Sequence, residues 1–250
     1  MEGLLTAIGM LSVIPMPWVS TRPGALGRAA LWFPVVGLMV GAALAAVAFG
    51  SHLAWGDRWI AASLVIGVNL LLTGGLHIDG LMDTADAFFS RKDRDRMLEI
   101  MRDSRAGALG VASGIAFLLA KFCAISYLIG SGSLRMLAVM SLSVALGRVG
   151  IVAAASFFPS ARETGLGAAF AAEVRPRHLL AGTAVALTIA SAIWQWRGLV
   201  LVGVALVAAL ANGLYWRRRL GGLTGDIYGA INEKVELAVL LTAGAFVSIG

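Results

Sequence analysis

Long apolar stretches constrain this chain of 250 residues more than any other feature. A helix needs about 20 mostly apolar residues to cross the hydrocarbon core of a bilayer. We therefore expect spans at residues 29–54, 59–76, 106–130, 136–158, 179–194, 199–215 and 235–250. The composition agrees, because 59% of the residues are hydrophobic and only 14% are charged, whereas soluble domains are about 25% charged. The sequence predicts an all-α, polytopic transmembrane helical bundle of about seven spans.

Residues 1–18 are also apolar, but they do not fit a cleaved signal peptide. They contain Glu2, lack a basic stretch and are interrupted by Pro15 and Pro17,. We expect a re-entrant or interfacial segment here. The single cysteine, Cys123, excludes a disulfide scaffold,. The formal charge of +6 suggests loops beside anionic lipid and not a nucleic-acid partner,.

The basic residues predict the orientation of the spans. If the segment before the first span is cytoplasmic, Arg58, Arg135 and Arg197 lie on the opposite side, and Lys121 and Arg148 lie within spans. The other fifteen of the 20 Lys and Arg residues are then cytoplasmic, namely Arg22, Arg28, Arg91, Lys92, Arg94, Arg96, Arg102, Arg105, Arg162, Arg175, Arg177, Arg217, Arg218, Arg219 and Lys234. This asymmetry follows the positive-inside rule. We expect an integral protein of the cytoplasmic (inner) membrane, with its functional groups on the cytoplasmic face, where most of the acidic residues also gather.

The segment 73–86 (TGGLHIDGLMDTAD) carries the strongest chemical signal. Asp79, Asp83 and Asp86 are spaced i, i+4 and i+7, so a helix places them within about 60° of one another on one face. Three carboxylates on one stripe repel each other, and Mg²⁺ prefers such oxygen ligands while keeping waters for substrate phosphates. The pattern predicts a Mg²⁺ site made by these three residues. A solvated helix end is the alternative.

His77 lies within the same segment. Its ordinary pKa lies near neutrality, so it is suited to carrying a proton or positioning a phosphate. Mg²⁺ prefers oxygen over imidazole nitrogen, which argues against a ligand role. A histidine that is only hydrogen-bonded at a helix boundary is the alternative.

The segment 101–110 (MRDSRAGALG) leads directly into an expected span. Arg102 and Arg105 have planar guanidinium groups that bind phosphate oxygens through several donors, and Ser104 lies between them. We expect these three residues to bind substrate phosphates. Anchoring of the span by the positive charges is the alternative.

A second acidic cluster follows a glycine-rich turn near the C-terminus. Asp226, Glu233 and Glu236 lie on one side of an expected helix,. Glu236 falls within the last span, where an ionisable group indicates function by default. We expect this cluster either to hold a second metal ion or to pair with Arg102 and Arg105.

Taken together, these motifs resemble the cobalamin synthase family nearly from end to end. The resemblance is carried by the segments IPMP (14–17), WFPVVG (32–37), GGLHIDG (74–80), DTAD (83–86), MRDSRAGALG (101–110), ARETGLG (161–167) and GGLTGD (221–226). One departure is Ala87, where the family usually has glycine after the third aspartate.

The resemblance implies a single integral-membrane catalytic domain over residues 1–250 that performs a Mg²⁺-dependent transfer. The small-molecule substrates would be GDP-activated (adenosyl)cobinamide and α-ribazole or its 5′-phosphate. GMP would leave, and (adenosyl)cobalamin or its 5′-phosphate would form. Asp79, Asp83 and Asp86 would hold Mg²⁺ on the pyrophosphate, one of them or His77 would accept the hydroxyl proton, and the Arg102 segment would bind phosphates.

Two other function classes remain as alternatives. A phosphatidyltransferase of the CDP-alcohol type also has an aspartate-rich helix, but its signature spreads Asp-Gly, Ala-Arg, a glycine and two further aspartates over a longer stretch. A cation transporter is expected to have carboxylates near the bilayer midplane and two related halves. The sequence shows no clear internal repeat.

Overall fold

The computed structural model describes residues 2–16 and 22–249, and this part of the chain is built from helices. The described helices are α1 (Glu2–Leu11), α2 (Ala25–Ala30), α3 (Phe33–Trp55), α4 (Arg58–Thr73), α5 (Leu76–Ser90), α6 (Arg94–Ile100), α7 (Ala108–Gly130), α8 (Leu134–Phe157), α9 (Leu166–Glu173), α10 (Pro176–Leu220) and α11 (Gly225–Ile249). The all-α prediction is confirmed. The end of the expected interfacial segment, Pro17 and Trp18, lies outside the described residues.

Several of these helices are long and apolar enough to cross a membrane. Within the described residues they are α3, α7, α8 and α10, with a fifth span if α4 and α5 are counted as one bent helix. The chain is therefore a membrane protein. Because α11 carries Glu233, Lys234 and Glu236, it is not among these helices, and the number of seven spans stays a prediction.

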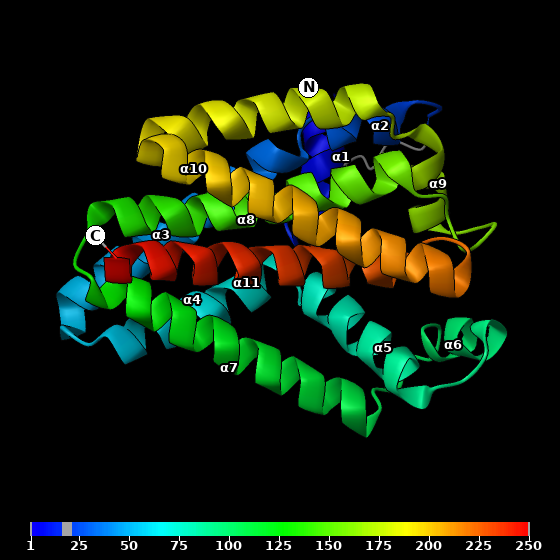
Figure 1. The fold of residues 1–250 in the computed structure, drawn as a ribbon, viewed down its shortest axis with the longest axis horizontal. Coiled ribbons are helices and arrows are strands. Elements are labelled where there is room, and N and C mark those ends of the chain that lie inside the picture. Colours follow the sequence, from blue (N-terminus) through cyan, green and yellow to red (C-terminus); the bar gives the residue numbers. More distant parts are fainter. Residues whose placement is uncertain (1, 17–21, 250) are drawn as a thin grey trace.

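Helix α10 covers two of the expected spans. Its backbone is non-helical at Trp194 and Gln195, and Figure 1 shows its two halves running in opposite directions. A Cβ at Gly198 would collide with the backbone of Ala190, so the two halves meet just after the turn. The expected segments 179–194 and 199–215 are thus the two arms of one helical hairpin.

The expected span 59–76 differs from the structure because a sharp turn interrupts it. Helix α4 ends at Thr73, and Gly74 and Gly75 follow with φ of 61° and 69°. Two successive residues in the left-handed region favour glycine strongly. Both glycine N–H groups donate to the Leu70 carbonyl. The chain bends here by 90° before α5 begins, which directs the aspartate helix toward α11.

Helix α8 is the centre of the bundle and packs against α3, α10 and α11. Its contact with α3 depends on small residues, because a Cβ at Gly37 or Gly41 would lie 2.6 Å from the Cα of Ala145 or Ser141, respectively. Close backbone approach of this kind stabilises helix pairs in membranes through van der Waals contact. The α3–α8 pair is therefore closely packed along its small residues.

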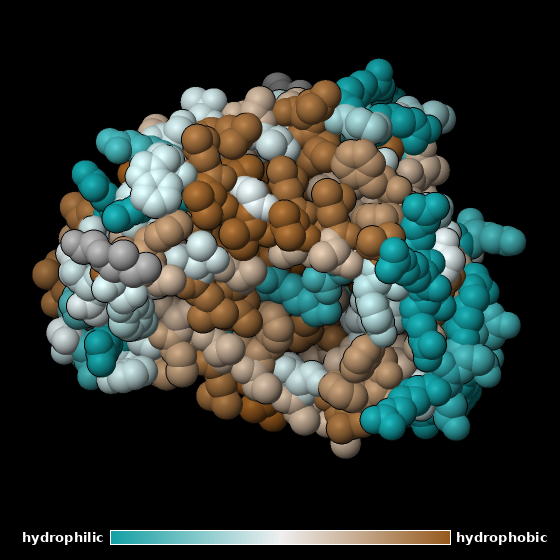
Figure 2. All heavy atoms as spheres, viewed as in Figure 1, coloured by the Kyte–Doolittle hydropathy of each residue, from teal (hydrophilic) through white to brown (hydrophobic). Residues whose placement is uncertain are grey.

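The two ends of the bundle differ in polarity. Figure 2 shows an apolar surface over the middle of the molecule and hydrophilic side chains gathered most densely at the end where α6 lies. The segment 91–96 at this end contains Arg91, Lys92, Arg94 and Arg96, all of them exposed. This end carries much of the basic charge that the sequence predicts for one side of the membrane.

Substitution of Gly41 tests the close packing of α3 on α8. We expect Gly41→Ala to lower the thermal unfolding midpoint in detergent by several degrees, because overpacking costs about 1–3 kcal/mol. Gly50→Ala on the same helix is the matched control, since a Cβ there meets nothing within 4 Å. Equal midpoints for the two variants would contradict this packing.

Candidate functional site

Helices α5 and α11 approach each other backbone to backbone. A Cβ at Gly80 would lie 2.6 Å from the Asp226 carbonyl oxygen, and a Cβ at Gly229 would lie 3.1 Å from the His77 carbonyl oxygen. Only glycine permits this approach at Gly80 without displacing α11. The contact brings the first turn of α11 beside the aspartates of α5.

The carboxylates of Asp79, Asp83 and Asp226 form a cluster at this contact, which we call the carboxylate cluster. The Asp83 carboxylate is affected first by its partial burial and then by like-charge repulsion from Asp79, Asp226 and Asp86, and the Arg162 guanidinium opposes both effects. Asp226 also accepts a hydrogen bond of 3.1 Å from the Thr224 hydroxyl. Asp226, which the sequence placed in a second cluster, therefore belongs with the aspartates of α5.

The carboxylate cluster has the donor chemistry of a Mg²⁺ site, because all its ligating atoms are carboxylate oxygens. Within residues 2–16 and 22–249, however, no group of three or more His, Cys, Asp or Glu side chains is placed closely enough to hold a metal ion. The carboxylates would have to turn toward one another to do so. The Mg²⁺ site stays a prediction.

Asp86 has a different environment from the other two aspartates of α5. Its carboxylate accepts hydrogen bonds from the backbone N–H groups of Gly107 at 2.8 Å and Gly110 at 2.6 Å. A Cβ at Gly107 would lie 2.5 Å from this carboxylate, so the contact requires glycine. Asp86 thus satisfies N–H groups that the first turn of α7 leaves unpaired, and it ties α5 to α7. Its predicted role as a metal ligand is untested.

Two cavities meet at Asp79. A cavity of about 630 Å³ runs along the glycine turn and the end of α1, and its lining includes Ser12, Gly74, Gly75, Asp79 and Met82. A second cavity of about 200 Å³ lies between α5, α9 and α11, and its lining includes Phe33, Asp79, Phe170, Asp226 and Tyr228. The carboxylate cluster therefore borders enough open volume to receive a small-molecule substrate.

The predicted phosphate-binding segment lies apart from the cluster. Arg102, Ser104 and Arg105 are exposed, and within the described residues no hydrogen bond or ion pair joins them to Asp79 or Asp83. Arg105 instead donates to Asp103 at 2.7 Å and 2.9 Å. These hydrogen bonds lower the pKa of Asp103 to about 2. For phosphate binding, Arg105 would first have to leave this pair.

The arginine that reaches the carboxylate cluster is Arg162, which sequence reasoning counted only as a basic loop residue. Its Nη2 lies 3.3 Å from the Asp226 carboxylate and donates to the Leu98 carbonyl at 3.4 Å. Its Nε is buried with no partner among the described residues. A guanidinium that lies beside carboxylates and has one unpaired donor can bind an anionic substrate group, while the carboxylates bind the cation that accompanies it.

The loop that carries Arg162 is held in place by backbone hydrogen bonds. Ala161 donates to the Leu223 carbonyl at 2.8 Å, and Leu223 donates to the Pro159 carbonyl at 2.9 Å. The Ser160 hydroxyl donates to the Arg162 carbonyl at 2.8 Å and accepts from the Arg162 N–H at 3.1 Å. This loop is the motif ARETGLG, so the only sequence signal for Arg162 was its place in a resembling segment.

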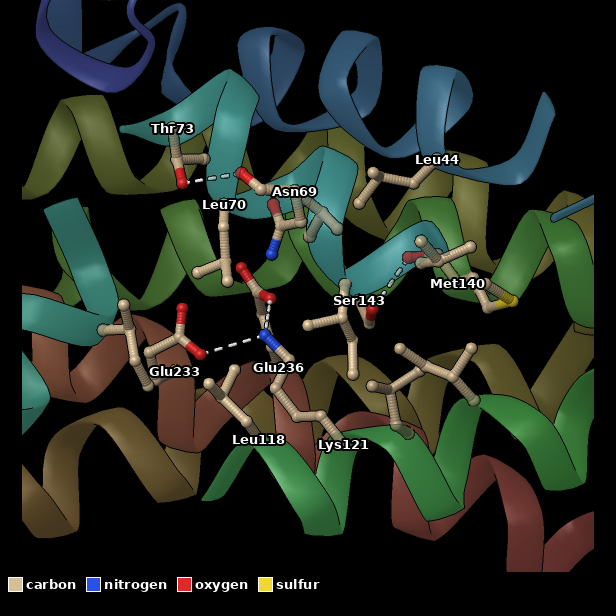
Figure 3. A pocket seen from close by; sticks show the side chains of 16 residues that line it. Leu44, Asn69, Leu70, Thr73, Leu118, Lys121, Met140, Ser143, Glu233 and Glu236 are labelled. Carbon is tan, nitrogen blue, oxygen red and sulfur yellow. Dashed lines mark hydrogen bonds and ion pairs between the residues drawn. The ribbon is translucent and has the colours of Figure 1, made fainter. Parts of the chain in front are cut away.

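The rest of the second acidic cluster lies deeper in the bundle. Lys121 donates to Glu233 at 2.9 Å and to Glu236 at 2.7 Å, as Figure 3 shows. Glu236 also accepts a hydrogen bond from Arg148 and one of 2.8 Å from Asn232. We call these five residues the buried ion network. The glutamates therefore pair with Lys121 and Arg148 and not with Arg102 or Arg105, because charges within an apolar bundle pair locally.

His77 lies between the carboxylate cluster and the buried ion network. Its side chain is buried, and it lines the 200 Å³ cavity. Lys121 and Arg148 both act on it electrostatically. The structure thus places His77 in the protein interior beside the predicted site, and its role in proton transfer or phosphate positioning stays a prediction.

Comparisons with known proteins agree with one another. A family model described as "Cobalamin-5-phosphate synthase" matches residues 3–244. Relatives named "Adenosylcobinamide-GDP ribazoletransferase" include one from Roseiflexus sp. (strain RS-1), 37% identical over 94% of this chain and 87% of its own length. Another, from Herpetosiphon aurantiacus, is 37% identical over 99% of this chain and 98% of its own length. One from Pseudomonas savastanoi pv. phaseolicola is 39% identical over 88% of this chain and 89% of its own length. No solved structure matches the chain.

Removal of one charge tests the buried ion network. We expect Lys121→Met to lower the thermal unfolding midpoint in detergent by about 10 °C, because breaking a buried ion pair costs about 3–5 kcal/mol. Arg96→Met is the control, since the Arg96–Glu99 pair is exposed and such pairs contribute little. A midpoint for Lys121→Met within about 2 °C of the control would contradict the network's structural role.

Proposed function

Because this chain belongs to the cobalamin-5-phosphate synthase family, we propose that it joins GDP-activated (adenosyl)cobinamide to α-ribazole or its 5′-phosphate. The chain is a transferase of cobalamin synthesis. In the proposed reaction a ribose hydroxyl oxygen bonds to the phosphorus that carries cobinamide, and the bond from that phosphorus to the GMP oxygen breaks. The products are GMP and (adenosyl)cobalamin or its 5′-phosphate.

The observation that supports this chemistry most directly is the carboxylate cluster at the meeting point of two cavities. Asp79 lines both cavities, so it can face an acceptor in one and a donor in the other. We propose that a carboxylate of the cluster that does not bind Mg²⁺, or His77, takes the proton from the attacking hydroxyl. A carboxylate near the hydroxyl serves this purpose when it lies within hydrogen-bond reach.

The phosphate charge is the second requirement of the reaction. Arg162 lies beside Asp226 with one buried donor unpaired, and a guanidinium matches phosphate oxygens in planar, multi-donor geometry. We assign Arg162 to the pyrophosphate of the donor substrate. Arg102, Ser104 and Arg105 remain proposed contacts for more exposed phosphate groups, once Arg105 has left Asp103.

Mg²⁺ is the proposed cofactor, held by carboxylate oxygens of Asp79 and Asp83 with Asp226. When bound, it would neutralise charge on the departing GMP. Asp86, a ligand in the sequence-based prediction, would first have to release the N–H groups of Gly107 and Gly110. The protein positions these carboxylates on α5 and α11, which contact each other at Gly80.

The proposed location of the site is the cytoplasmic face of the inner membrane. The positive-inside rule places the Lys- and Arg-rich segments in the cytoplasm, and α6, at the same end as the densest hydrophilic surface, lies in one of these segments (Figure 2). The alternative of a cation transporter has less support, because Lys121 and Arg148 already balance Glu233 and Glu236. The CDP-alcohol alternative lacks the motif spacing of that class.

The reaction itself is tested by incubating purified protein with adenosylcobinamide-GDP, α-ribazole and Mg²⁺ and measuring GMP. We expect Asp79→Asn and Asp83→Asn to lower GMP release roughly 100-fold or more while the thermal unfolding midpoint stays unchanged or rises. Asp86→Asn should lower both activity and the midpoint, because it loosens α5 from α7. Excess Mg²⁺ or Mn²⁺ should partly restore any variant whose defect is metal binding.

The control for these variants is Asp95→Asn, since Asp95 is exposed on α6. It should release GMP at the wild-type rate. Wild-type rates in both Asp79→Asn and Asp83→Asn would instead show that the aspartates are a solvated helix end. Absence of GMP release by the wild-type protein would overturn the proposed function.

Two arginine variants test the assignment of the phosphate-binding residue. Arg162→Lys should lower kcat/KM about tenfold, because lysine lacks the planar fork of guanidinium. Arg105→Lys should change it less than about twofold, since Arg105 is exposed and pairs with Asp103,. The reverse order of effects in the same GMP assay would make the Arg102 segment, and not Arg162, the main contact of the pyrophosphate.

A further inference from the structure

The 200 Å³ cavity beside Asp79 has strongly aromatic walls, and we call it the aromatic pocket. The rings of Phe33 and Phe170 stack with centroids 5.0 Å apart at 13°, and the Tyr228 ring meets Phe170 edge-on at 6.1 Å. All three side chains are at least nine-tenths buried. Such walls present flat, rigid, apolar surface to a ligand.

Helix α9 is held firmly across this pocket. Glu173, its last residue, accepts hydrogen bonds from the backbone N–H groups of Gly24 at 2.7 Å and Gly27 at 3.0 Å. At the other end of the helix, a Cβ at Gly167 would lie 2.9 Å from the Gly225 nitrogen. Phe170 lies between these two attachments, so its ring is fixed relative to α2 and α11.

The aromatic pocket also has two polar features. Asp79 and Asp226 line it, so it is continuous with the carboxylate cluster. Tyr228 lines it as well, and the Tyr228 Oη is buried with no hydrogen-bond partner among the described residues. A buried hydroxyl without a partner is unfavourable unless a ligand supplies one. The pocket wall is therefore mostly apolar, with carboxylates at one side, and the Tyr228 hydroxyl is buried and unpaired behind the ring that lines it.

Among the parts of the proposed substrates, one matches this combination. The corrin ring system is far larger than the pocket. Guanine has acceptors at O6, N7 and N3 as well as N–H donors, and the carboxylates of the pocket can pair only with the donors. The pocket would leave most of the acceptors unpaired, which selects against binding. A benzimidazole-type base is planar and apolar apart from one free ring nitrogen, which accepts a single hydrogen bond.

We propose that the aromatic pocket binds the base of the ribazole acceptor, and that the Tyr228 side chain turns so that its buried, unpaired hydroxyl donates to the ring nitrogen of this base. This inference rests on the proposed function, because it assigns a place to one of its two substrates. With the base in the pocket, the attached ribose lies toward Asp79 and Asp226. The pocket thereby selects acceptors with flat, apolar bases and delivers a ribose hydroxyl to the carboxylate cluster.

The test measures α-ribazole binding to the purified wild-type protein by calorimetry, without donor substrate or Mg²⁺, and then KM for each substrate. Phe170→Ala should weaken α-ribazole binding at least tenfold, and Tyr228→Phe should weaken it about fivefold. Both should leave KM for adenosylcobinamide-GDP unchanged. Tyr228→Phe should also reduce the preference for a benzimidazole base over a base that lacks the free ring nitrogen, which a merely structural role would not do.

The matched control is Phe88→Ala, which lies in a different aromatic cavity beside Tyr215 and Trp216. Phe88 is five residues beyond Asp83 on α5 and faces away from the carboxylate cluster,. This variant should alter neither substrate. If Phe170→Ala fails to fold, Ile151→Phe, which fills the same pocket from α8, should weaken α-ribazole binding to a similar degree.

The possible outcomes separate this inference from the proposed function. An increase in KM for adenosylcobinamide-GDP alone would place guanine in the pocket and overturn the inference. Unchanged α-ribazole binding in all pocket variants, or no binding by the wild-type protein, would also overturn it. Failure of the proposed function is a separate result, seen as absence of GMP release by a wild-type protein that binds α-ribazole.

Discussion

The buried ion network is the constraint on which the position of α11 depends. Lys121 and Arg148 supply two positive charges, and Glu233 and Glu236 supply two negative charges, all of them at most 6% exposed in their side chains. Each charge alone would cost several kcal/mol in an apolar interior, so rotation of α11 about its axis is strongly opposed. Because Asp226 lies about 10 Å earlier on the same helix, the network also fixes the direction in which Asp226 points.

The bundle thus contains two charged groups of opposite character. In the network, every carboxylate has a cation within ion-pair distance, and the charges balance. In the carboxylate cluster, Arg162 pairs with Asp226 and also acts on Asp83, and within residues 2–16 and 22–249 no ion pair reaches Asp79 or Asp83. Uncompensated like charges are unfavourable for folding alone and are typical of sites that bind a cation and an anionic substrate. The first group gives the helices their positions, and the second is left available for chemistry.

Periodicity and composition predicted those parts of the structure that are local in sequence. The apolar stretches gave the helices, and the i, i+4, i+7 spacing placed the aspartates on one face of α5. Long-range partners were not predictable in this way. Asp86 binds N–H groups 21 and 24 residues away, and Lys121 pairs with Glu236 across 115 residues. Spacing identifies the face of a helix but not the helix that packs against it.

The clearest example of this limit is Arg162. It lies in a loop without helical periodicity, and only the hydrogen bonds between residues 159–161 and Leu223 bring it to Asp226. The sequence-based choice of Arg102 and Arg105 rested on their guanidinium chemistry and on their place directly before an expected span. In three dimensions the more distant arginine is the one that contacts the carboxylate cluster.

The central claim is that carboxylates from α5 and α11 act as one unit, and a double-mutant cycle on turnover tests it most directly. GMP release would be measured for Asp79→Asn, Asp226→Asn and the combined variant at saturating Mg²⁺. Residues that act as a unit show strongly non-additive losses. We expect the combined variant to be no slower than the slower single variant. Independent losses that multiply in the combined variant would contradict it.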